Sequence, residues 1–289
     1  MNEWENQISI NPQRDPFEVI YINDIRDALR NDDKFNELDG ATRKSIDNDK
    51  LAIPYQQDRE GYNGTDHLAY WLGGRSDYKT YVDIYKKDST SGINKITHLD
   101  FGCASGRFLR HMINQCDFDA KVYGCDLNRR HVEFLQRYFR QQNTCFFQNT
   151  SVPFLPLKSG ELDSLTAYSV FSHIDLLETS WLMEFRRVLK TSGIALLSYH
   201  PLELLHEENA HLPFYNSIAR HSEWMDISKR VRDGGQDKIV IRWKNDASYT
   251  ANVFLSEEYV KLTWGSIMEI VEIRHNAHGY QSICVLKNV

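Results

Sequence analysis

The sequence lacks the long apolar run that a membrane span requires. Its 289 residues are 41% hydrophobic and 26% charged, and wholly apolar stretches such as residues 194–197 (Ile-Ala-Leu-Leu) are far shorter than the roughly 20 residues that cross a bilayer. Residues 1–7 are polar and acidic, without the basic and apolar regions of a secretory signal. We therefore expect a cytoplasmic protein with no membrane partner.

Cysteines are few, and basic residues are not in excess. The five cysteines include no Cys-x-x-Cys pair, a pattern that suits neither a disulfide framework nor a zinc knuckle. Residues 1–60 hold 14 acidic and 8 basic residues, whereas the rest of the chain balances at 26 of each. Without a basic excess there is little counterion-release energy to hold DNA or RNA. We expect no nucleic-acid partner.

The first 90 residues read as a mostly helical appendage. Apolar residues recur at helical spacing over residues 17–30, and residues 67–87 predict one or two helices interrupted at Gly73 and Gly74. The aromatic and charged segment around those glycines suits either a lid hinged at them or a helix pair that uses its aromatics as core. The predicted domains are a cap or lid over residues 1–90 and a catalytic domain over 91–289.

From residue 96 onward, short apolar runs alternate with amphipathic stretches. Such alternation predicts an α/β fold with a doubly wound, mostly parallel sheet of seven strands. Two strand-like runs, 267–274 and 280–286, predict a C-terminal antiparallel hairpin around a turn at 276–279. Residues 201–254 exceed what a crossover needs and predict an insertion. The other expected strands are 96–101, 121–125, 144–148, 162–169 and 193–199, and the expected helices are 106–115, 129–141 and 176–189.

The first strand-to-helix turn of such a sheet is a common ligand site, because a glycine-rich loop can bring backbone N–H groups up to an anion. Here that turn is Leu-Asp-Phe-Gly-Cys-Ala-Ser-Gly-Arg, residues 99–107. The nicotinamide fingerprint G-x-G-x-x-G would need glycines at 102, 104 and 107, and only Gly102 matches. The spacing therefore disfavours a dinucleotide.

The same turn resembles the cofactor loop of class I S-adenosylmethionine-dependent methyltransferases, in which an acid precedes three alternate glycines. Asp100, Gly102 and Gly106 are in register, and Ala104 replaces the middle glycine. The resemblance implies a Rossmann-like fold and S-adenosylmethionine as cofactor. It implies that the loop, including Cys103, wraps the amino-acid end of the cofactor, with Asp100 favouring the ammonium group.

Asp126 ends the second expected strand, 20 residues past Gly106. A carboxylate there can accept hydrogen bonds from both hydroxyls of a ribose, as the matching acid does in these methyltransferases. It could instead cap the helix that follows. The resemblance also places Asn149 where many members carry an acid that reads the adenine amino group.

Further segments resemble the same family in the expected order. They are residues 149–157 (Asn-Thr-Ser-Val-Pro-Phe-Leu-Pro-Leu), 162–174, 185–193 (Phe-Arg-Arg-Val-Leu-Lys-Thr-Ser-Gly), 254–260 and 278–286. Together they carry the resemblance from about residue 96 to 286. Carried over residue by residue, the resemblance adds Leu127, Thr150 and Ser169 to the expected cofactor site. Arg107, which opens the helix after the loop, could pair with the cofactor carboxylate or lie on the surface.

Two histidines lie where a general base could stand. His173 follows the fourth expected strand and His200 ends the fifth, both at the carboxyl edge of the sheet. An unperturbed imidazole titrates near pH 6.5, so either could take a proton from an acceptor at neutral pH. The alternative is that His173 only packs near the cofactor and His200 merely terminates a strand.

Other patterns favour plain structural roles, and no metal site is predicted. His206 and His211 are five residues apart, which on a helix would turn their side chains about 140° apart, unlike the spacing of four in H-E-x-x-H. Residues 169–173 (Ser-Val-Phe-Ser-His) lack the motifs that methylation of a nucleic-acid base requires. The paired arginines at 129–130 and 186–187 are expected on solvated faces.

The sequence thus predicts an S-adenosylmethionine-dependent methyltransferase that acts on a small-molecule or glycan-like acceptor, with oxygen as the methylated atom. The alternative is a non-catalytic methyltransferase-like protein that serves as a partner or scaffold, with residues 1–60 as a docking segment. A nicotinamide oxidoreductase ranks third. The sequence does not specify the acceptor or the oligomeric state.

Overall fold

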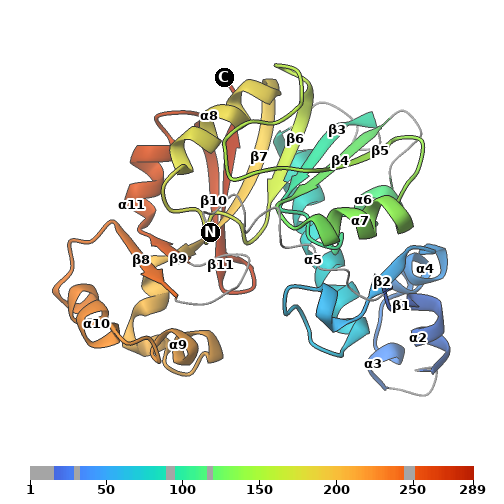
Figure 1. Cartoon of the computed structure of the whole chain (residues 1–289), viewed down its shortest axis with the longest axis horizontal. Coiled ribbons are helices and arrows are strands. Elements are labelled where there is room, and N and C mark those ends of the chain that lie inside the picture. The colour runs from blue at the N-terminus through green and yellow to red at the C-terminus, as the bar shows by residue number, and fades with distance from the viewer. Residues whose placement is uncertain (1–15, 29–32, 89–94, 116–119, 244–250) are drawn as a thin grey trace. The chain divides into compact units, whose positions relative to one another are not determined.

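The computed structural model divides the chain into two compact units, residues 1–150 and 151–289, and Figure 1 shows their elements. The acidic start of the chain and Cys116 lie outside the described residues. The structure describes residues 16–28, 33–88, 95–115, 120–243 and 251–289.

Unit 1 begins with helices and a small hairpin. The helix expected over residues 17–30 begins only at Ile22, because residues 19–21 form a strand that pairs antiparallel with β2, with Val19 opposite Pro54. The N-terminal elements are β1 (Val19–Tyr21), α2 (Ile22–Ala28), α3 (Asp33–Asn36), α4 (Gly40–Asn48), β2 (Ala52–Pro54), η1 (Gln56–Asp58) and α5 (His67–Asp88).

Three parallel strands follow in the same unit. β4 pairs with β3 on one side and with β5 on the other, and helix α7 packs against β4 and β5. Asn128 caps α7, because its side chain accepts a hydrogen bond from Arg130 N. The elements are β3 (Thr97–Phe101), α6 (Leu109–Ile113), β4 (Lys121–Asp126), α7 (Arg129–Tyr138) and β5 (Thr144–Gln148).

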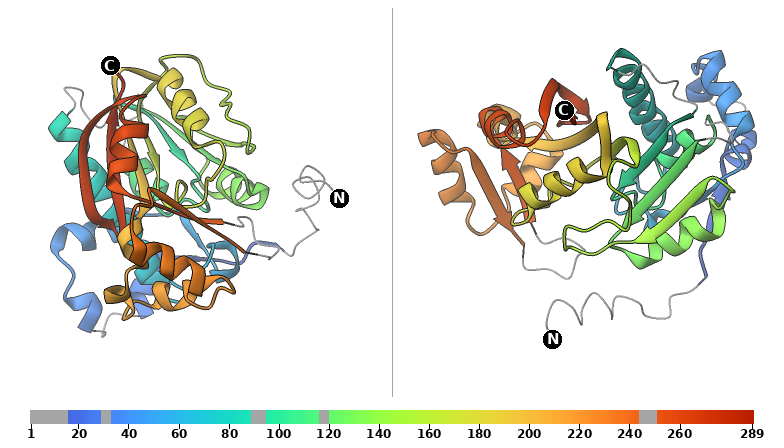
Figure 2. Two further views of the ribbon diagram at one scale, coloured as in Figure 1. Left: turned by 90° about the vertical axis from the view of Figure 1, so that its left-hand side faces the viewer. Right: turned by 90° about the horizontal axis from the view of Figure 1, so that it is seen from above.

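Unit 2 contains the remaining strands. β7 pairs parallel with β6 and antiparallel with β11, and the long β10–β11 pair is the red ribbon of Figure 2. The buried face of α8 repeats at helical spacing, which packs it onto β7. The principal elements are β6 (Leu162–Ala167), α8 (Glu178–Val188), β7 (Leu189–Pro201), β10 (Glu269–His278) and β11 (Gln281–Lys287).

The segment between β7 and β10 has its own small apolar core. It begins with two 3-10 turns. Its strand β9 pairs in parallel with the end of β7, with His200 opposite Phe254. Ile239 and Ile241 of β8 are buried in that core. The elements are η3 (Leu202–Leu205), η4 (Glu207–Asn209), α9 (Pro213–Ile218), α10 (Trp224–Asp233), β8 (Lys238–Arg242), β9 (Ala251–Leu255), α11 (Glu257–Tyr259) and η5 (Val260–Trp264).

The predicted fold class, an α/β fold with a mostly parallel sheet and a C-terminal antiparallel hairpin, is confirmed. One detail is wrong: the hairpin does not turn at residues 276–279, because β10 continues to His278 through an irregularity at Asn276, whose φ is 51°. None of the described helices is both long and apolar enough to cross a membrane.

Candidate active site

The loop between β3 and α6 is tied to the next strand by its own backbone donors. Gly102 N and Cys103 N both donate to Cys125 O, at 2.8 and 3.0 Å, and Ala104 N donates to Asp126 Oδ2 at 2.8 Å. These three N–H groups are therefore occupied within the protein. A dinucleotide pyrophosphate depends on such donors, so this geometry also disfavours a nicotinamide cofactor.

The backbone of the loop is left-handed at three alternate positions. The φ angles are 72° at Gly102, 45° at Ala104 and 82° at Gly106. Glycine adopts this region freely, but an L-residue with a Cβ is strained there. Ala104, at the position of the middle glycine, thus adds local strain to the loop. Cys103 is buried, and burial raises the pKa of its thiol well above the usual value.

Asp126 connects this loop to helix α7. Its Oδ2 accepts from Ala104 N and its Oδ1 accepts from Asn128 N, each at 2.8 Å. A carboxylate offers about four acceptor positions, so Asp126 can still accept from a ribose hydroxyl. The N-cap of α7 is Asn128 rather than Asp126. Asp126 orients this cap residue by accepting a hydrogen bond from its backbone N–H.

Asn149 lies at the end of β5, beside the end of β4. Its side chain is buried at 7% exposure, and its Oδ1 has no hydrogen-bond partner among the described residues. A buried acceptor without a donor is costly, and an adenine amino group would supply one. Leu127, an apolar residue next to Asp126, is 43% exposed. These features of unit 1 fit the adenosine half of S-adenosylmethionine.

The other residues predicted to bind the cofactor lie in or just after strands. Asp100 is the penultimate residue of β3 and is buried. Gly106 lies in the loop before α6, and Thr150 is exposed after the end of β5. All the predicted cofactor residues from Asp100 to Thr150 lie in unit 1, on the ends of β3, β4 and β5 or the loops after them. Ser169 and the two histidines lie in unit 2.

Helix α5 packs tightly against the cofactor loop. It runs without interruption from His67 to Asp88, so the interruption predicted at Gly73 and Gly74 is wrong. A Cβ on Gly74 would lie 2.0 Å from the carbonyl oxygen of Arg107, so Gly74 allows close approach of two backbones. The Arg107 guanidinium pairs with Asp77 of α5 at 2.7 Å and is largely buried, which rules out a surface role.

We expect Gly74→Ala to lower the free energy of unfolding by about 1–3 kcal/mol and to weaken cofactor binding, because the added methyl overpacks the loop. Gly40→Ala is the matched control, since no atom lies within 4 Å of its Cβ position. Urea unfolding and calorimetric titration measure both effects. A Gly74→Ala protein with the stability and affinity of the control would contradict the packing explanation.

Residues 55–66, which we name the strap, were missed as part of the site. The strap joins β2 to α5 and folds around the buried Arg59, which donates to Pro54 O at 2.6 Å and to Gly64 O at 3.2 Å. The hydroxyl of Ser105 in the cofactor loop donates to Asp58 O. Arg130 of α7 forms an ion pair with the buried Asp58, so the prediction of a solvated Arg130 is wrong.

A polar network in unit 2 surrounds the ends of β6 and β7. Ser169 has a φ of 55° and donates its N–H to Ser198 Oγ at 2.6 Å. Gln281 Nε2 donates to Ser169 Oγ at 2.8 Å and to His200 Nε2 at 3.3 Å, and Gln281 Oε1 accepts from Ser198 Oγ. Gln281 was missed, although a glutamine that begins an apolar strand was a visible signal.

His173 and His200 lie side by side, with ring centroids 6.1 Å apart. His173 Nδ1 is 2.8 Å from Ala251 O and must donate to it, so Nε2 is the basic nitrogen. His200 accepts from Gln281 at Nε2, so its buried Nδ1 carries the proton, and it has no hydrogen-bond partner among the described residues. Burial, with smaller contributions from His173 and His278, holds the pKa of His200 well below its usual value.

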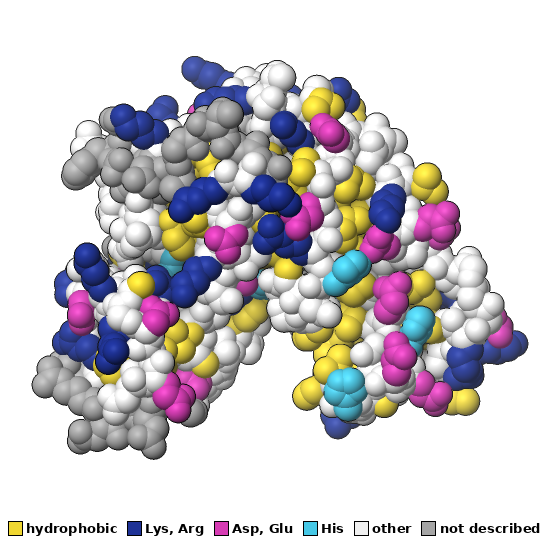
Figure 3. All heavy atoms as spheres, turned by 180° about the vertical axis from the view of Figure 1, so that it is seen from behind, with side chains coloured by type: hydrophobic (Ala, Val, Ile, Leu, Met, Phe, Trp, Pro, Cys, Tyr) yellow, Lys and Arg dark blue, Asp and Glu magenta, His cyan; other side chains and the backbone are white. Residues whose placement is uncertain are grey.

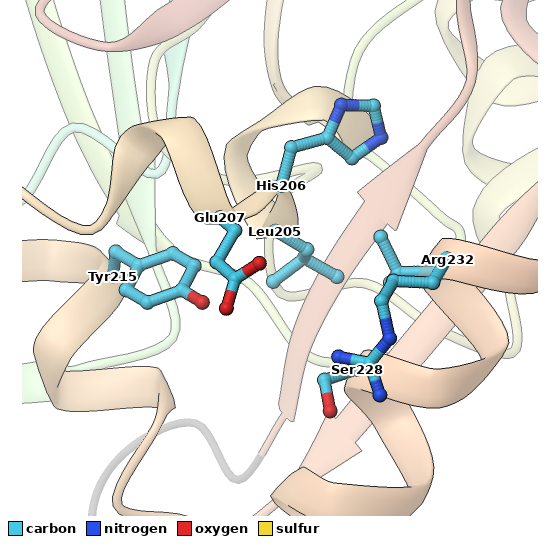
Figure 4. A pocket seen from close by; sticks show the side chains of 7 residues that line it. Leu205, His206, Glu207, Tyr215, Ser228 and Arg232 are labelled. Carbon is cyan, nitrogen blue, oxygen red and sulfur yellow. The ribbon is translucent and has the colours of Figure 1, made fainter.

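The segment between β7 and β8 carries a separate hollow of about 240 Å³ (Figure 4). His206 and Glu207 line it together with Tyr215 and Arg232. His206 and His211 are exposed, and a 3-10 turn, not the expected helix, lies between them. Figure 3 shows histidine and acidic side chains near one another on the surface of this segment. None of the predicted site residues lines the hollow.

Comparison with known proteins agrees with the fold. A family model described as a methyltransferase domain matches residues 99–193. Among solved structures, a SAM-dependent methyltransferase of Methanosarcina mazei is 14% identical, with a TM-score of 0.51, over 71% of this chain and 97% of that chain. A Pyrococcus horikoshii protein is 17% identical, with a TM-score of 0.54, over 81% and 98%. No curated protein matches the sequence.

A third solved structure is a complex from Haloferax volcanii between a methyltransferase activator and a methyltransferase. It is 14% identical, with a TM-score of 0.50, over 76% of this chain and 93% of that chain. At these identities the solved structures establish the fold, and the family match identifies the domain. Residues 99–193 match a methyltransferase domain, within a fold shared with solved structures that include a SAM-dependent methyltransferase. These findings support the predicted enzyme class, a methyltransferase, and its cofactor, S-adenosylmethionine.

Proposed function

We propose that the protein uses S-adenosylmethionine to methylate a small-molecule or glycan-like acceptor at an oxygen atom. The observation that carries the cofactor assignment is the pair formed by Asp126 and Asn149 on adjacent strand ends, a carboxylate with spare acceptor positions and a buried amide oxygen without a donor. Asp126 would hold the ribose and Asn149 the adenine amino group. Asp100 would face the ammonium group of the amino-acid end.

S-adenosylmethionine would supply a methyl group bound to a sulfonium, and transfer of that methyl group leaves a neutral thioether. The work left to this chain is alignment, which can contribute roughly 7–11 kcal/mol, and removal of the acceptor proton. Arg107 does not need to pair with the cofactor in this scheme, because Asp77 already neutralises it.

The two histidines of unit 2 support a hydroxyl acceptor. His173 is held by Ala251 O so that its Nε2 can take a proton. His200 stays neutral and offers a buried N–H donor that could orient an oxygen of the acceptor. Phe214 and Tyr280 stack on each other beside His200, with their ring centroids 4.5 Å apart, and an aromatic cluster of this kind suits a sugar or phenol ring.

The test begins with calorimetric titration of the protein with S-adenosylmethionine and S-adenosylhomocysteine. Micromolar binding justifies a screen of sugars, phenols and amines, with release of S-adenosylhomocysteine as the readout. No binding of either compound would overturn the proposal. Tight binding without turnover on any acceptor would favour the non-catalytic alternative.

We expect His173→Asn to lower kcat with a hydroxyl acceptor by about 100-fold, because it removes the general base, while the affinity for S-adenosylhomocysteine stays unchanged. The exposed His206→Asn is the matched control. The loss should shrink at high pH, where solvent hydroxide competes with the missing base. An unchanged kcat would exclude His173 as the base.

A further inference from the structure

His131 occupies an unusual position between two carboxylates of unit 1. It lies in the first turn of α7 and is 3% exposed. Its Nε2 is 3.5 Å from Glu60 Oε1, and its Nδ1 is 3.6 Å from Asp126 Oδ1. Nδ1 makes no hydrogen bond among the described residues. Because a carboxylate lies near each ring nitrogen, the buried imidazole can carry a proton on both nitrogens.

Glu60 belongs to the strap, and its carboxylate reaches the start of α7. Glu60 Oε1 accepts a hydrogen bond from Asn128 Nδ2 at 3.1 Å. The backbone of Glu60 is left-handed, with a φ of 51°. Asn128 in turn donates its N–H to Asp126 Oδ1. Glu60 and His131 therefore connect the strap to Asp126, the acid assigned to the ribose.

We propose that His131 is a positioning residue of the cofactor site, whose imidazolium bridges Glu60 and Asp126 and thereby couples closure of the strap and cofactor affinity to pH. The proposal rests on the function proposed above, because it assigns Asp126 to the cofactor. His131 does not itself touch the cofactor in this account; it acts through the two carboxylates.

Electrostatics gives the direction of the effect. Burial by itself would lower the pKa of His131, but Asp126, Glu60 and Asp58 outweigh it and raise the pKa above its usual value. The charge of Asp58 is balanced by Arg130, so Glu60 and Asp126 are the acids that the imidazolium contacts at its two nitrogens. When His131 loses its proton, one ring nitrogen can no longer donate to its carboxylate, and the strap contact weakens.

The pH window follows from the sign of that shift. A group whose pKa is raised by folding adds stability below its unfolded value, near 6.5, and that stability is lost as the pH rises through the folded value. The strap is thus held below the unfolded pKa and released as the pH rises through the folded pKa of His131, which lies above the unfolded one. By linkage, a cofactor that binds the bridged form better must raise the pKa of His131 by the matching amount.

The experiment is titration of the whole protein with S-adenosylhomocysteine at several pH values between about 5.5 and 8.5. For the unaltered protein we expect affinity to fall about fivefold across the titration of His131, within the usual range of coupling between sites. His131→Gln, which is neutral throughout, should show weak affinity that does not depend on pH. Glu60→Gln should flatten the profile in the same way.

Arg129→Gln on the exposed face of α7 is the matched control and should keep the original profile. The histidine resonances in NMR spectra give an independent readout: the pKa of His131 should fall in Glu60→Gln and rise when S-adenosylhomocysteine binds. If His131→Gln and the unaltered protein share one pH profile, the positioning role is overturned while the cofactor assignment stands. If S-adenosylhomocysteine binds at no pH, the proposed function itself fails, and the coupling fails with it.

Discussion

Asp126→Asn is expected to weaken binding of S-adenosylhomocysteine by about 100-fold. Hydrogen bonds to a charged group contribute roughly 1.5–3 kcal/mol each, and each 1.4 kcal/mol is a tenfold change in affinity. The amide also turns a donor toward either Ala104 N or Asn128 N, both of which need an acceptor. The loss should therefore combine a weaker ribose contact with a less ordered loop.

Calorimetric titration measures the affinity, and urea unfolding separates the two causes. Glu133→Gln, another acid-to-amide change on the outer part of α7, is the control and should leave the affinity unchanged. If Asp126→Asn changes the stability but leaves the affinity unchanged, Asp126 only organises the loop and the ribose assignment is wrong.

Arg110→Met is expected to destabilise unit 1 by about 3–5 kcal/mol, because it leaves the buried charge of Asp49 without its partner. Both side chains are fully buried: Arg110 Nε and Nη2 contact the Asp49 carboxylate at 2.8 and 3.2 Å, and Trp71 Nε1 donates to it at 2.7 Å. Arg110 also donates to the carbonyls of Ala52 and Leu51. This one pair connects α6, directly after the cofactor loop, to the N-terminal helices.

A double-mutant cycle tests the pair. Asp49→Leu together with Arg110→Met should recover much of the loss, since replacing both buried ions removes the unpaired charge. Arg26, which pairs with Asp47 on the surface, offers the control: Arg26→Met should change stability by less than about 1 kcal/mol. Additive losses at Asp49 and Arg110 would show that the two residues do not act as a pair.

The same pair predicts how stability depends on pH. Burial would raise the pKa of Asp49, but Arg110 and the hydrogen bonds from Trp71 and Leu51 outweigh it and lower that pKa. A depressed carboxylate pKa contributes stability above the unfolded value, near 4, and that contribution is lost as the pH falls through the folded value. Acid unfolding of the unaltered protein should therefore include this step, and the double variant should lack it.

The strands and helices of the catalytic part were predictable because their signals are local. Residues 144–148 form β5 as expected, and the other predicted strands differ from the observed ones mainly at their ends. The cofactor loop was predictable for the same reason, since its glycines and Asp100 are close in sequence. Asp126 and Asn149 followed from their positions at strand ends, because parallel strands bring these ends to one edge.

The strap was not predictable, because its contacts are distant in sequence. Asp58 pairs with Arg130 over 72 positions, and Ser105 reaches Asp58 over 47. Gly74 shows the same limit. Glycine in a helix suggests a hinge when only local propensity is considered, whereas here it is required by the Arg107 backbone that packs against it. His131 likewise reads as an ordinary helical residue until the fold brings Glu60 to it.

The sequence alone determined the order of strands and helices in the α/β part, the methyltransferase resemblance and the positions proposed for the cofactor residues, because periodicity and short motifs act over a few residues. The tertiary structure alone decided which charges meet: Asp49 with Arg110, Asp77 with Arg107, and Glu60 and Asp126 around His131. Those pairings depend on burial, which removes the screening of water and makes the position of each partner decisive.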